Sequence, residues 1–198
     1  MEPVLFRSIA RACLLLALFV FLSACSPKLN WRTVQTPEQR YTALFPGKPD
    51  KLERLVPYQD QELKQTLEAV KIDDDIYSIS SINISAQQAA LAPKIIDQLQ
   101  SNLLDRAKAS GGTVLENDVF YQTSNHQRLA TRDYFITFNA NGRVQQWMRV
   151  RWITRSAENG SMWVYQVSVL HANTDTGEVK VLLSKEEYEN FFNEFHPE

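Results

Sequence analysis

Three extended segments joined by two tight turns constrain the fold of this chain more than any other feature. Residues 128–138, 143–155 and 161–171 are rich in β-branched and aromatic side chains, which is typical of β-strands. The sequences between them, 139–142 (NANG) and 158–160 (ENG), carry the Asn-Gly pairs that favour tight turns. Connections this short join antiparallel strands. This part of the chain therefore predicts an antiparallel meander.

Further strands are expected before the meander. Residues 40–45 alternate and end at 46–47 (PG), a pair that suits the central positions of a type II turn. Extended stretches follow at 62–72 and 75–85, with 73–75 (DDD) as the hairpin tip between them, and another covers 113–122. These segments predict that the sheet contains more strands than the meander alone.

Two helices are predicted by apolar positions with a period of 3.6 residues. Pro93 suits the first turn of a helix over about 93–109, and 111–112 (GG) ends it. A final helix begins with a capping box from Ser184 to Glu187. Its apolar stripe consists of Tyr188, Phe191, Phe192 and Phe195. The fold class expected from these elements is α+β, a mainly antiparallel β-sheet with packed helices.

The N-terminal segment has the features of an export signal. Arg7 and Arg11 precede an uncharged apolar run over 12–22, which is shorter than the roughly 20 residues of a membrane-spanning helix. The run ends in 22–25 (LSAC), which resembles the lipobox of bacterial lipoproteins. That resemblance implies cleavage between Ala24 and Cys25 and attachment of diacylglycerol to the Cys25 thiol. A cleaved soluble protein and a signal anchor are the alternatives.

This interpretation divides the chain into a signal peptide (1–24), a lipidated cysteine with a short linker (25–30) and one domain (31–198). The lipid on Cys25 would make the membrane a partner and place the protein in the cell envelope. Ser26 is similar to the residue that releases lipoproteins to the outer membrane, facing the periplasm, in a Gram-negative host. Because Cys13 leaves with the signal and Cys25 carries lipid, the mature protein is expected to contain no disulfide.

Composition is consistent with one globular domain. Hydrophobic residues make up 44% of the chain and aromatic residues 11%, enough for a substantial core. The formal net charge of −2 is not that of a nucleic-acid-binding protein, and an exported protein would not meet such a partner. Nucleic acid is therefore not expected among its ligands.

The stretch 41–49 (YTALFPGKP) resembles the opening of small bacterial envelope lipoproteins with a PsbP-like (DcrB-type) domain. The order of the predicted elements is similar over most of 31–198: a hairpin, a long helix, a meander and a closing helix. The resemblance implies a PsbP-like fold and a non-catalytic binding or assembly module that has an envelope protein as its partner. It supplies no shared catalytic residues and no cofactor, so none is carried over to this chain.

An arginine-rich segment is the strongest candidate for a binding site. Residues 128–155 contain six arginines, no lysine and one acidic residue, Asp133. Arginines beside an aromatic ring suit recognition of an anionic partner, because guanidinium groups bind carboxylate and phosphate in bidentate fashion. The residues proposed for this role are Arg132, Arg143, Trp147, Arg149 and Arg151. The alternative is internal pairing with the acidic stretches 53–75 and 175–198, which is common across sheet faces.

On the 143–155 strand, period-two alternation places Trp147, Arg149, Arg151 and Ile153 on one face. Met148, Val150 and Trp152 fall on the other face. The sequence therefore predicts which of these side chains lie together.

No catalytic or metal-binding residues are predicted. The acidic run 73–75 lacks the spaced ligands of a calcium loop, and His126, His171 and His196 lack metal-ligand spacing. The expected function is a membrane-anchored envelope lipoprotein that acts as a non-catalytic binding or assembly module. The alternatives are a small-ligand carrier, a small envelope enzyme or a binder of anionic lipid headgroups. A polar cleft with shifted pKa values would favour a carrier or enzyme, and an exposed arginine–tryptophan patch would favour partner binding.

Overall fold

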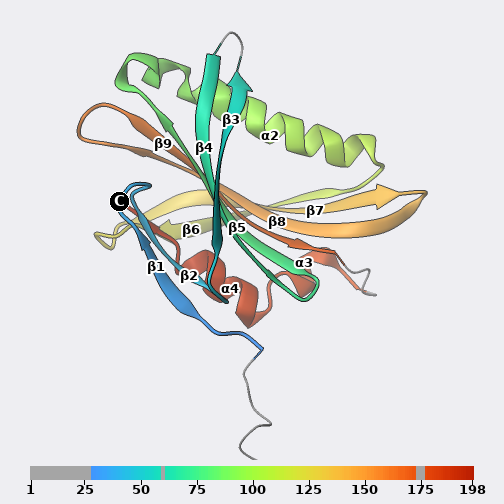
Figure 1. The fold of residues 1–198 in the computed structure, drawn as a ribbon. Helices are drawn as coiled ribbons and strands as arrows, with labels where there is room; N and C mark the ends of the chain where they lie inside the picture. The colour runs from blue at the N-terminus through green and yellow to red at the C-terminus, as the bar shows by residue number, and fades with distance from the viewer. Residues whose placement is uncertain (1–27, 59–60, 173–176) are drawn as a thin grey trace, which may run out of the picture. The chain divides into compact units, whose positions relative to one another are not determined.

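The computed structural model describes residues 28–58, 61–172 and 177–198, and residues Trp31–Glu198 form one compact unit. This unit is built around an antiparallel seven-stranded sheet with the strand order β3-β4-β5-β9-β8-β7-β6 (Figure 1). Its strands are β3 (Asp50–Tyr58), β4 (Gln61–Ile72), β5 (Asp75–Ile84), β6 (Val114–Gln122), β7 (Arg128–Ala140), β8 (Arg143–Ser156) and β9 (Met162–His171).

Two meanders make up this sheet. Strands β3 to β5 pair in sequence order, and strands β6 to β9 do the same. The two meanders meet where β5 pairs with β9, for example Ile79 opposite Val167. The antiparallel meander predicted for 128–171 is confirmed, as is the hairpin whose tip lies at Asp73 and Asp74. Strand β3 was not predicted from the sequence, because most of its side chains are exposed.

Helix α2 (Ala92–Ala109), which follows the 3₁₀ turn η1 (Ala86–Leu91), covers one face of the large sheet (Figure 1). Pro93 lies in its first turn, and Gly111 with a φ of 76° follows its end, as the sequence predicts. Ile95 packs with Ile82 and Val164 near the start of the helix. The C-terminal half packs against β7 and β8 through Ala107 and its neighbours. Burial of this apolar stripe holds the helix on the sheet.

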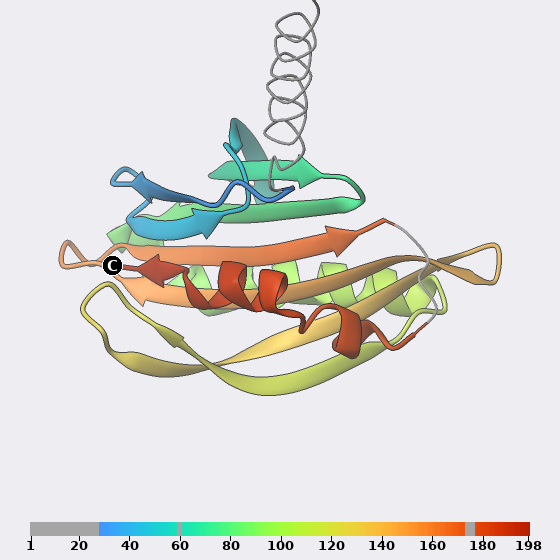
Figure 2. The same ribbon diagram turned by 90° about the horizontal axis from the view of Figure 1, so that it is seen from below.

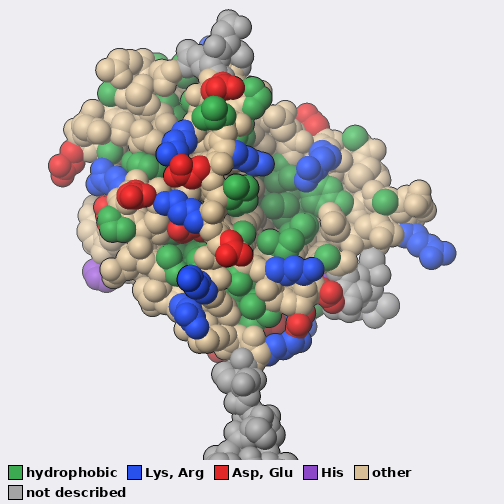
Figure 3. Space-filling view, in the orientation of Figure 1, with side chains coloured by type: hydrophobic (Ala, Val, Ile, Leu, Met, Phe, Trp, Pro, Cys, Tyr) green, Lys and Arg blue, Asp and Glu red, His purple; other side chains and the backbone are tan. Residues whose placement is uncertain are grey.

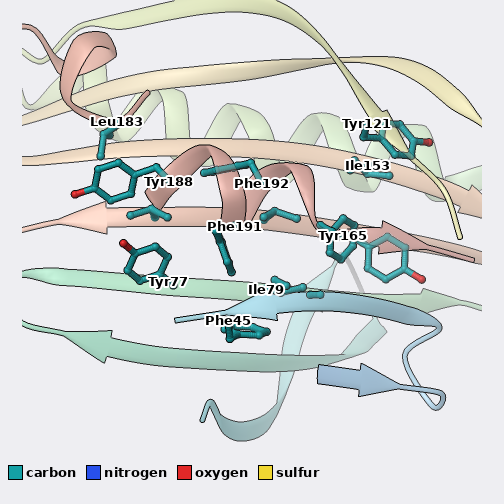
Figure 4. Packing of buried hydrophobic residues seen from close by; sticks show 14 of the residues in the cluster. Phe45, Tyr77, Ile79, Tyr121, Ile153, Tyr165, Leu183, Tyr188, Phe191 and Phe192 are labelled. Carbon is teal, nitrogen blue, oxygen red and sulfur yellow. The ribbon is translucent and has the colours of Figure 1, made fainter. Parts of the chain in front are cut away.

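The other face of the large sheet carries a second layer (Figure 2). It contains α3 (Val179–Leu182), α4 (Glu186–Asn193) and a three-stranded sheet of β1 (Arg32–Thr36), β2 (Tyr41–Phe45) and β10 (His196–Pro197) in the order β1-β2-β10. Phe191 of α4 points between Phe45 and Tyr77, with ring centroids 5.4 and 5.2 Å away (Figure 4). The predicted stripe of Tyr188, Phe191 and Phe192 is buried in this core.

Three local predictions are wrong. Helix α4 begins at Glu186 with Lys185 as its N-cap and no side-chain cap hydrogen bond, so Ser184 and Glu187 form no capping box. The helix ends at Asn193, and Phe195 reaches the same core from the segment after it. Gly47 does not adopt the positive φ that the third residue of a type II turn requires.

Candidate functional site

Strand β8 presents the predicted arginines to the layer that contains α4. Trp147 and Ile153 belong to the core between the sheet and α4, and Met148, Val150 and Trp152 belong to the core under α2. The predicted division of the β8 side chains between two faces is therefore confirmed. Arg149 and Arg151 lie on the α4 side and are only 2% and 1% exposed.

The two guanidinium groups share one buried carboxylate. Arg149 Nε donates to Asp133 Oδ2 at 2.9 Å, and Arg151 Nε donates to Asp133 Oδ1 at 2.6 Å. Strand register explains the meeting, because Asp133 stands directly opposite Arg151 on the neighbouring strand β7. Asp133 is completely buried. A buried charge needs partners of this kind, because its transfer from water is otherwise very costly.

The same arginines connect the sheet to the helical layer. Arg149 Nη1 donates to the Leu183 carbonyl at 2.9 Å and to Glu189 Oε1 at 2.8 Å. Arg151 Nη1 donates to the Phe192 carbonyl at 3.0 Å. Leu183 and Phe192 lie at the C-terminal ends of α3 and α4, where free carbonyls and the helix dipole favour a cation.

The arginine segment therefore does not form one exposed patch. Arg149 and Arg151 pair internally, as the second interpretation of the sequence predicts, although Asp133 lies outside both acidic stretches considered there. Trp147 is buried. Arg132 is exposed on the α2 side of β7 and pairs with Glu116 at 3.2 Å and with Asp118 at 3.0 Å. Arg143 is exposed at the start of β8. The face in Figure 3 likewise mixes both signs of charge.

A groove of about 550 Å³ opens beside this network, between strand β6 and helix α4. This volume lies within the range of about 300–1,000 Å³ that is typical of ligand sites. Phe135, Arg149 and Arg151 lie at its base, and Ser184, Glu189 and Asn193 line the helical side. The β6 side consists of the consecutive residues Asn117, Asp118, Val119, Phe120, Tyr121 and Gln122, with Arg128 beside them.

The groove combines aromatic, amide and charged groups. Burial raises the pKa of Tyr121, and the neighbouring Arg155 opposes this shift. Phe120 is 52% exposed and the Arg128 guanidinium lies 4.2 Å from its ring centroid, so both side chains are available to stack on a ligand. Of the described residues that line the groove, none is histidine or cysteine. The set is suited to binding and offers no side chain of those types for nucleophilic attack.

A second polar cluster lies at the other end of α4. His171 Nδ1 is 2.8 Å from Asp75 Oδ1, and the Tyr188 hydroxyl donates to Asp75 Oδ2 at 3.0 Å. Burial, together with the Asp75 charge, raises the pKa of Tyr188. His126 lies in the β6–β7 turn, and His196 lies in β10. Within the described ranges, no three histidine, cysteine or acidic residues gather as a metal site.

The predicted lipidation site falls outside the part of the chain that the structure describes. Ala24 and Cys25 precede residue 28, so the lipid anchor stays a prediction. None of the described helices is both long and apolar enough to cross a membrane.

Comparison with known proteins assigns no family to this chain. No protein-family model matches the chain, and no significantly similar relative was found among characterised proteins. The binding properties of the groove therefore follow from its own residues alone. Sequence reasoning missed its β6 side and its α4 side, because the two segments are more than 60 residues apart and share no motif. The one local signal was an aromatic residue, Phe120, two positions after the charged Asp118.

Proposed function

We propose that this protein is an envelope lipoprotein with a PsbP-like domain, anchored to the membrane through lipid on Cys25. In a Gram-negative host it would sit on the outer membrane and face the periplasm. Its role is that of a non-catalytic binding or assembly module for another envelope protein. The export signal and lipobox support the location, and the order of helices and strands supports the domain type.

The groove between β6 and α4 is the observation that carries the binding role. It is large enough for a ligand, and it joins the exposed Phe120 to the amide and carboxylate of Asn193 and Glu189. The Asp133 network holds its helical side in place, because Arg149 and Arg151 bind α4 from the sheet. A site supported by such a network needs little rearrangement before it binds.

In-cell photo-cross-linking of the lipidated full chain tests this proposal. A photoreactive amino acid at Asn193, which is exposed on the groove, should capture one abundant protein that mass spectrometry can identify. The matched control carries the same group at Leu55, which is 59% exposed on the distant strand β3. Equal capture from both positions, or no capture from Asn193, would contradict a binding site in the groove.

A small-ligand carrier is the second candidate, because the site is a polar cleft that contains a tyrosine with a raised pKa. Native mass spectrometry of the purified full chain in detergent separates the two candidates. A co-purified small molecule that is lost when Tyr121 is changed to Ala would favour a carrier. A protein captured at Asn193, with no such molecule, would favour the partner-binding module.

A further inference from the structure

Strand β6 is an outer strand of the large sheet, and its free side can be assigned residue by residue. The Thr137 amide donates to the Thr113 carbonyl, and the Thr123 amide donates to the Gln127 carbonyl. Both pairs continue the β6–β7 register at odd-numbered β6 positions. In an antiparallel pair, alternate residues direct both backbone groups to the partner strand, and those between direct them away. Glu116, Asp118 and Phe120 therefore point their amides and carbonyls outwards.

At the C-terminal end of β6, the outward backbone groups already have partners within the chain. His196 Nδ1 lies 3.1 Å from the Gln122 carbonyl, and the Ser124 amide donates to the Pro197 carbonyl at 3.0 Å. Both contacts involve even-numbered positions, as the alternation requires. Among the described residues, no hydrogen-bond partner meets the outward backbone groups of Glu116, Asp118 or Phe120. In Figure 2, β6 borders the sheet with no strand outside it.

The groove follows this same edge. Six consecutive β6 residues, 117–122, line it. Successive side chains of a strand point to opposite faces of the sheet, so one face alone would expose every second residue. The groove is therefore lined by the backbone of β6 as well as by its side chains, and it runs along the strand. At roughly 3.3 Å per residue, the lined stretch is about 20 Å long, the length of an ordinary β-strand.

The ends of the groove region carry cations that have no carboxylate partner among the described residues. Arg128 lies over the Phe120 ring, and Lys180 Nζ donates to Asn117 Oδ1 at 3.0 Å. By contrast, the acidic side chains of Glu116 and Asp118 are already paired with Arg132. A ligand with acidic groups would complement these two cations.

The opposite edge of the sheet differs. Strand β3 contains Pro57, which has no amide hydrogen, and charged side chains with partners of their own: Lys51 pairs with Glu38, and Glu53 pairs with Lys64. Prolines and charges on an edge strand discourage pairing with another chain. Strand β6 also carries charged side chains but contains no proline, so every residue of this edge strand keeps its amide hydrogen.

We propose that the occupant of the groove is an extended, acidic segment of a partner protein, which adds to β6 as an eighth antiparallel or parallel strand. It exchanges backbone hydrogen bonds with Glu116, Asp118 and Phe120, and its carboxylates meet Arg128 and Lys180. This inference rests on the proposed binding function and specifies the class of partner. Recognition by strand addition takes its affinity from main-chain hydrogen bonds and its specificity from alternate side-chain pockets.

A proline at position 118 tests the backbone contact. Because the Asp118 amide points away from β7, Asp118→Pro removes one outward donor without breaking the β6–β7 ladder. Asp118→Ala is the matched control, since it removes the same side chain and its pairing with Arg132 but keeps the amide. Both variants are made in the full chain that carries the photoreactive group at Asn193. Thermal unfolding followed by circular dichroism establishes that each remains folded.

We expect capture of the partner from Asn193 to fall roughly tenfold or more in Asp118→Pro and to stay near the parent level in Asp118→Ala. Equal capture in both variants would overturn strand addition while leaving the groove as the binding site. Absence of capture in the parent chain would instead contradict the proposed function. Capture of lipid rather than protein in the cross-linked product would overturn the proposed class of partner.

Two further measurements use features that only strand addition has. In hydrogen exchange of the purified complex, the amides of Asp118 and Phe120 should gain protection, whereas those of Asn117 and Val119 should change little because β7 already binds them. Arg128→Gln should lower capture severalfold, and Arg128→Lys should restore most of it. Uniform protection across β6 would overturn the backbone pairing, and an unchanged Arg128→Gln variant would overturn the acidic contact.

Discussion

Arg151 Nε lies 2.6 Å from Asp133 Oδ1, and the two side chains are 1% and 0% exposed. The adjacent Arg149 shares the same carboxylate, so one acidic residue in the middle of β7 holds two cations. These cations in turn bind the carbonyls of Leu183 and Phe192. A single buried aspartate therefore holds both arginines that make these polar contacts between the sheet and the helical layer.

Replacement of this aspartate should be strongly destabilising. We expect Asp133→Asn to lower the free energy of unfolding by about 3–5 kcal/mol, because it leaves the buried Arg151 without a countercharge and Arg149 with Glu189 alone. Urea denaturation measures the change. Asp118→Asn is the control, because its ion pair with Arg132 is exposed and should contribute at most about 1 kcal/mol. Similar losses in the two variants would contradict the central role of Asp133.

A second prediction concerns the close approach of the α2 end to β7. A Cβ atom at Gly112 would lie 1.8 Å from the Thr137 carbonyl oxygen, and backbone cannot rotate away as a side chain can. Gly112→Ala should therefore lower the free energy of unfolding by about 1–3 kcal/mol or more. Gly47→Ala is the matched control, since its new Cβ would meet the Val70 and Ile72 side chains at 3.2 and 3.5 Å and no backbone atom. Thermal melts of both variants should rank Gly112→Ala as the less stable.

A third prediction is alkaline unfolding. Burial raises the pKa of Tyr41, Tyr77, Tyr165 and Tyr188 above the ordinary value of about 10. The unfolded chain therefore releases these protons at lower pH than the folded protein does. Stability is fully present below about pH 10 and falls above it, by about 1.4 kcal/mol per pH unit for each tyrosine that is fully linked.

Urea denaturation over a series of pH values measures this slope. Tyr77→Phe should reduce it with little effect at neutral pH, because no hydrogen bond from the Tyr77 hydroxyl is seen among the described residues and the ring packing is kept. A free energy of unfolding that stays constant well above pH 10 would show that the buried phenols do not control alkaline stability.

A fourth prediction follows from the lipobox alone. Cys25→Ala should leave unprocessed precursor and abolish incorporation of labelled fatty acid, because the thiol is the site of diacylglycerol attachment. Cys13→Ala is the control and should be processed and labelled normally. Labelling that persists in Cys25→Ala would show that the anchor lies elsewhere.

Local pattern predicted most of the secondary structure. The β-branched and aromatic content of β7, β8 and β9 and the helical stripe of α2 each depend on neighbours in the chain, so they can be read from short windows. Strand β3 was not predicted because its side chains are mostly exposed, and β10 was not predicted because it has only two residues. The first turn of α4 differs from the predicted capping box because Lys185, which makes no side-chain cap hydrogen bond, occupies the N-cap position.

The sequence by itself determined that Arg149 and Arg151 share a face of β8 with Trp147, since this follows from the two-residue period of a strand. It also contained the export signal and Cys25, on which the predicted anchor depends. Only the tertiary structure decided that this face is covered by α4, that Asp133 pairs with both arginines, and that the open groove lies along β6. The reason is physical: periodicity specifies which side chains lie together, whereas burial depends on what packs over them, and α4 comes from more than 30 residues further along the chain.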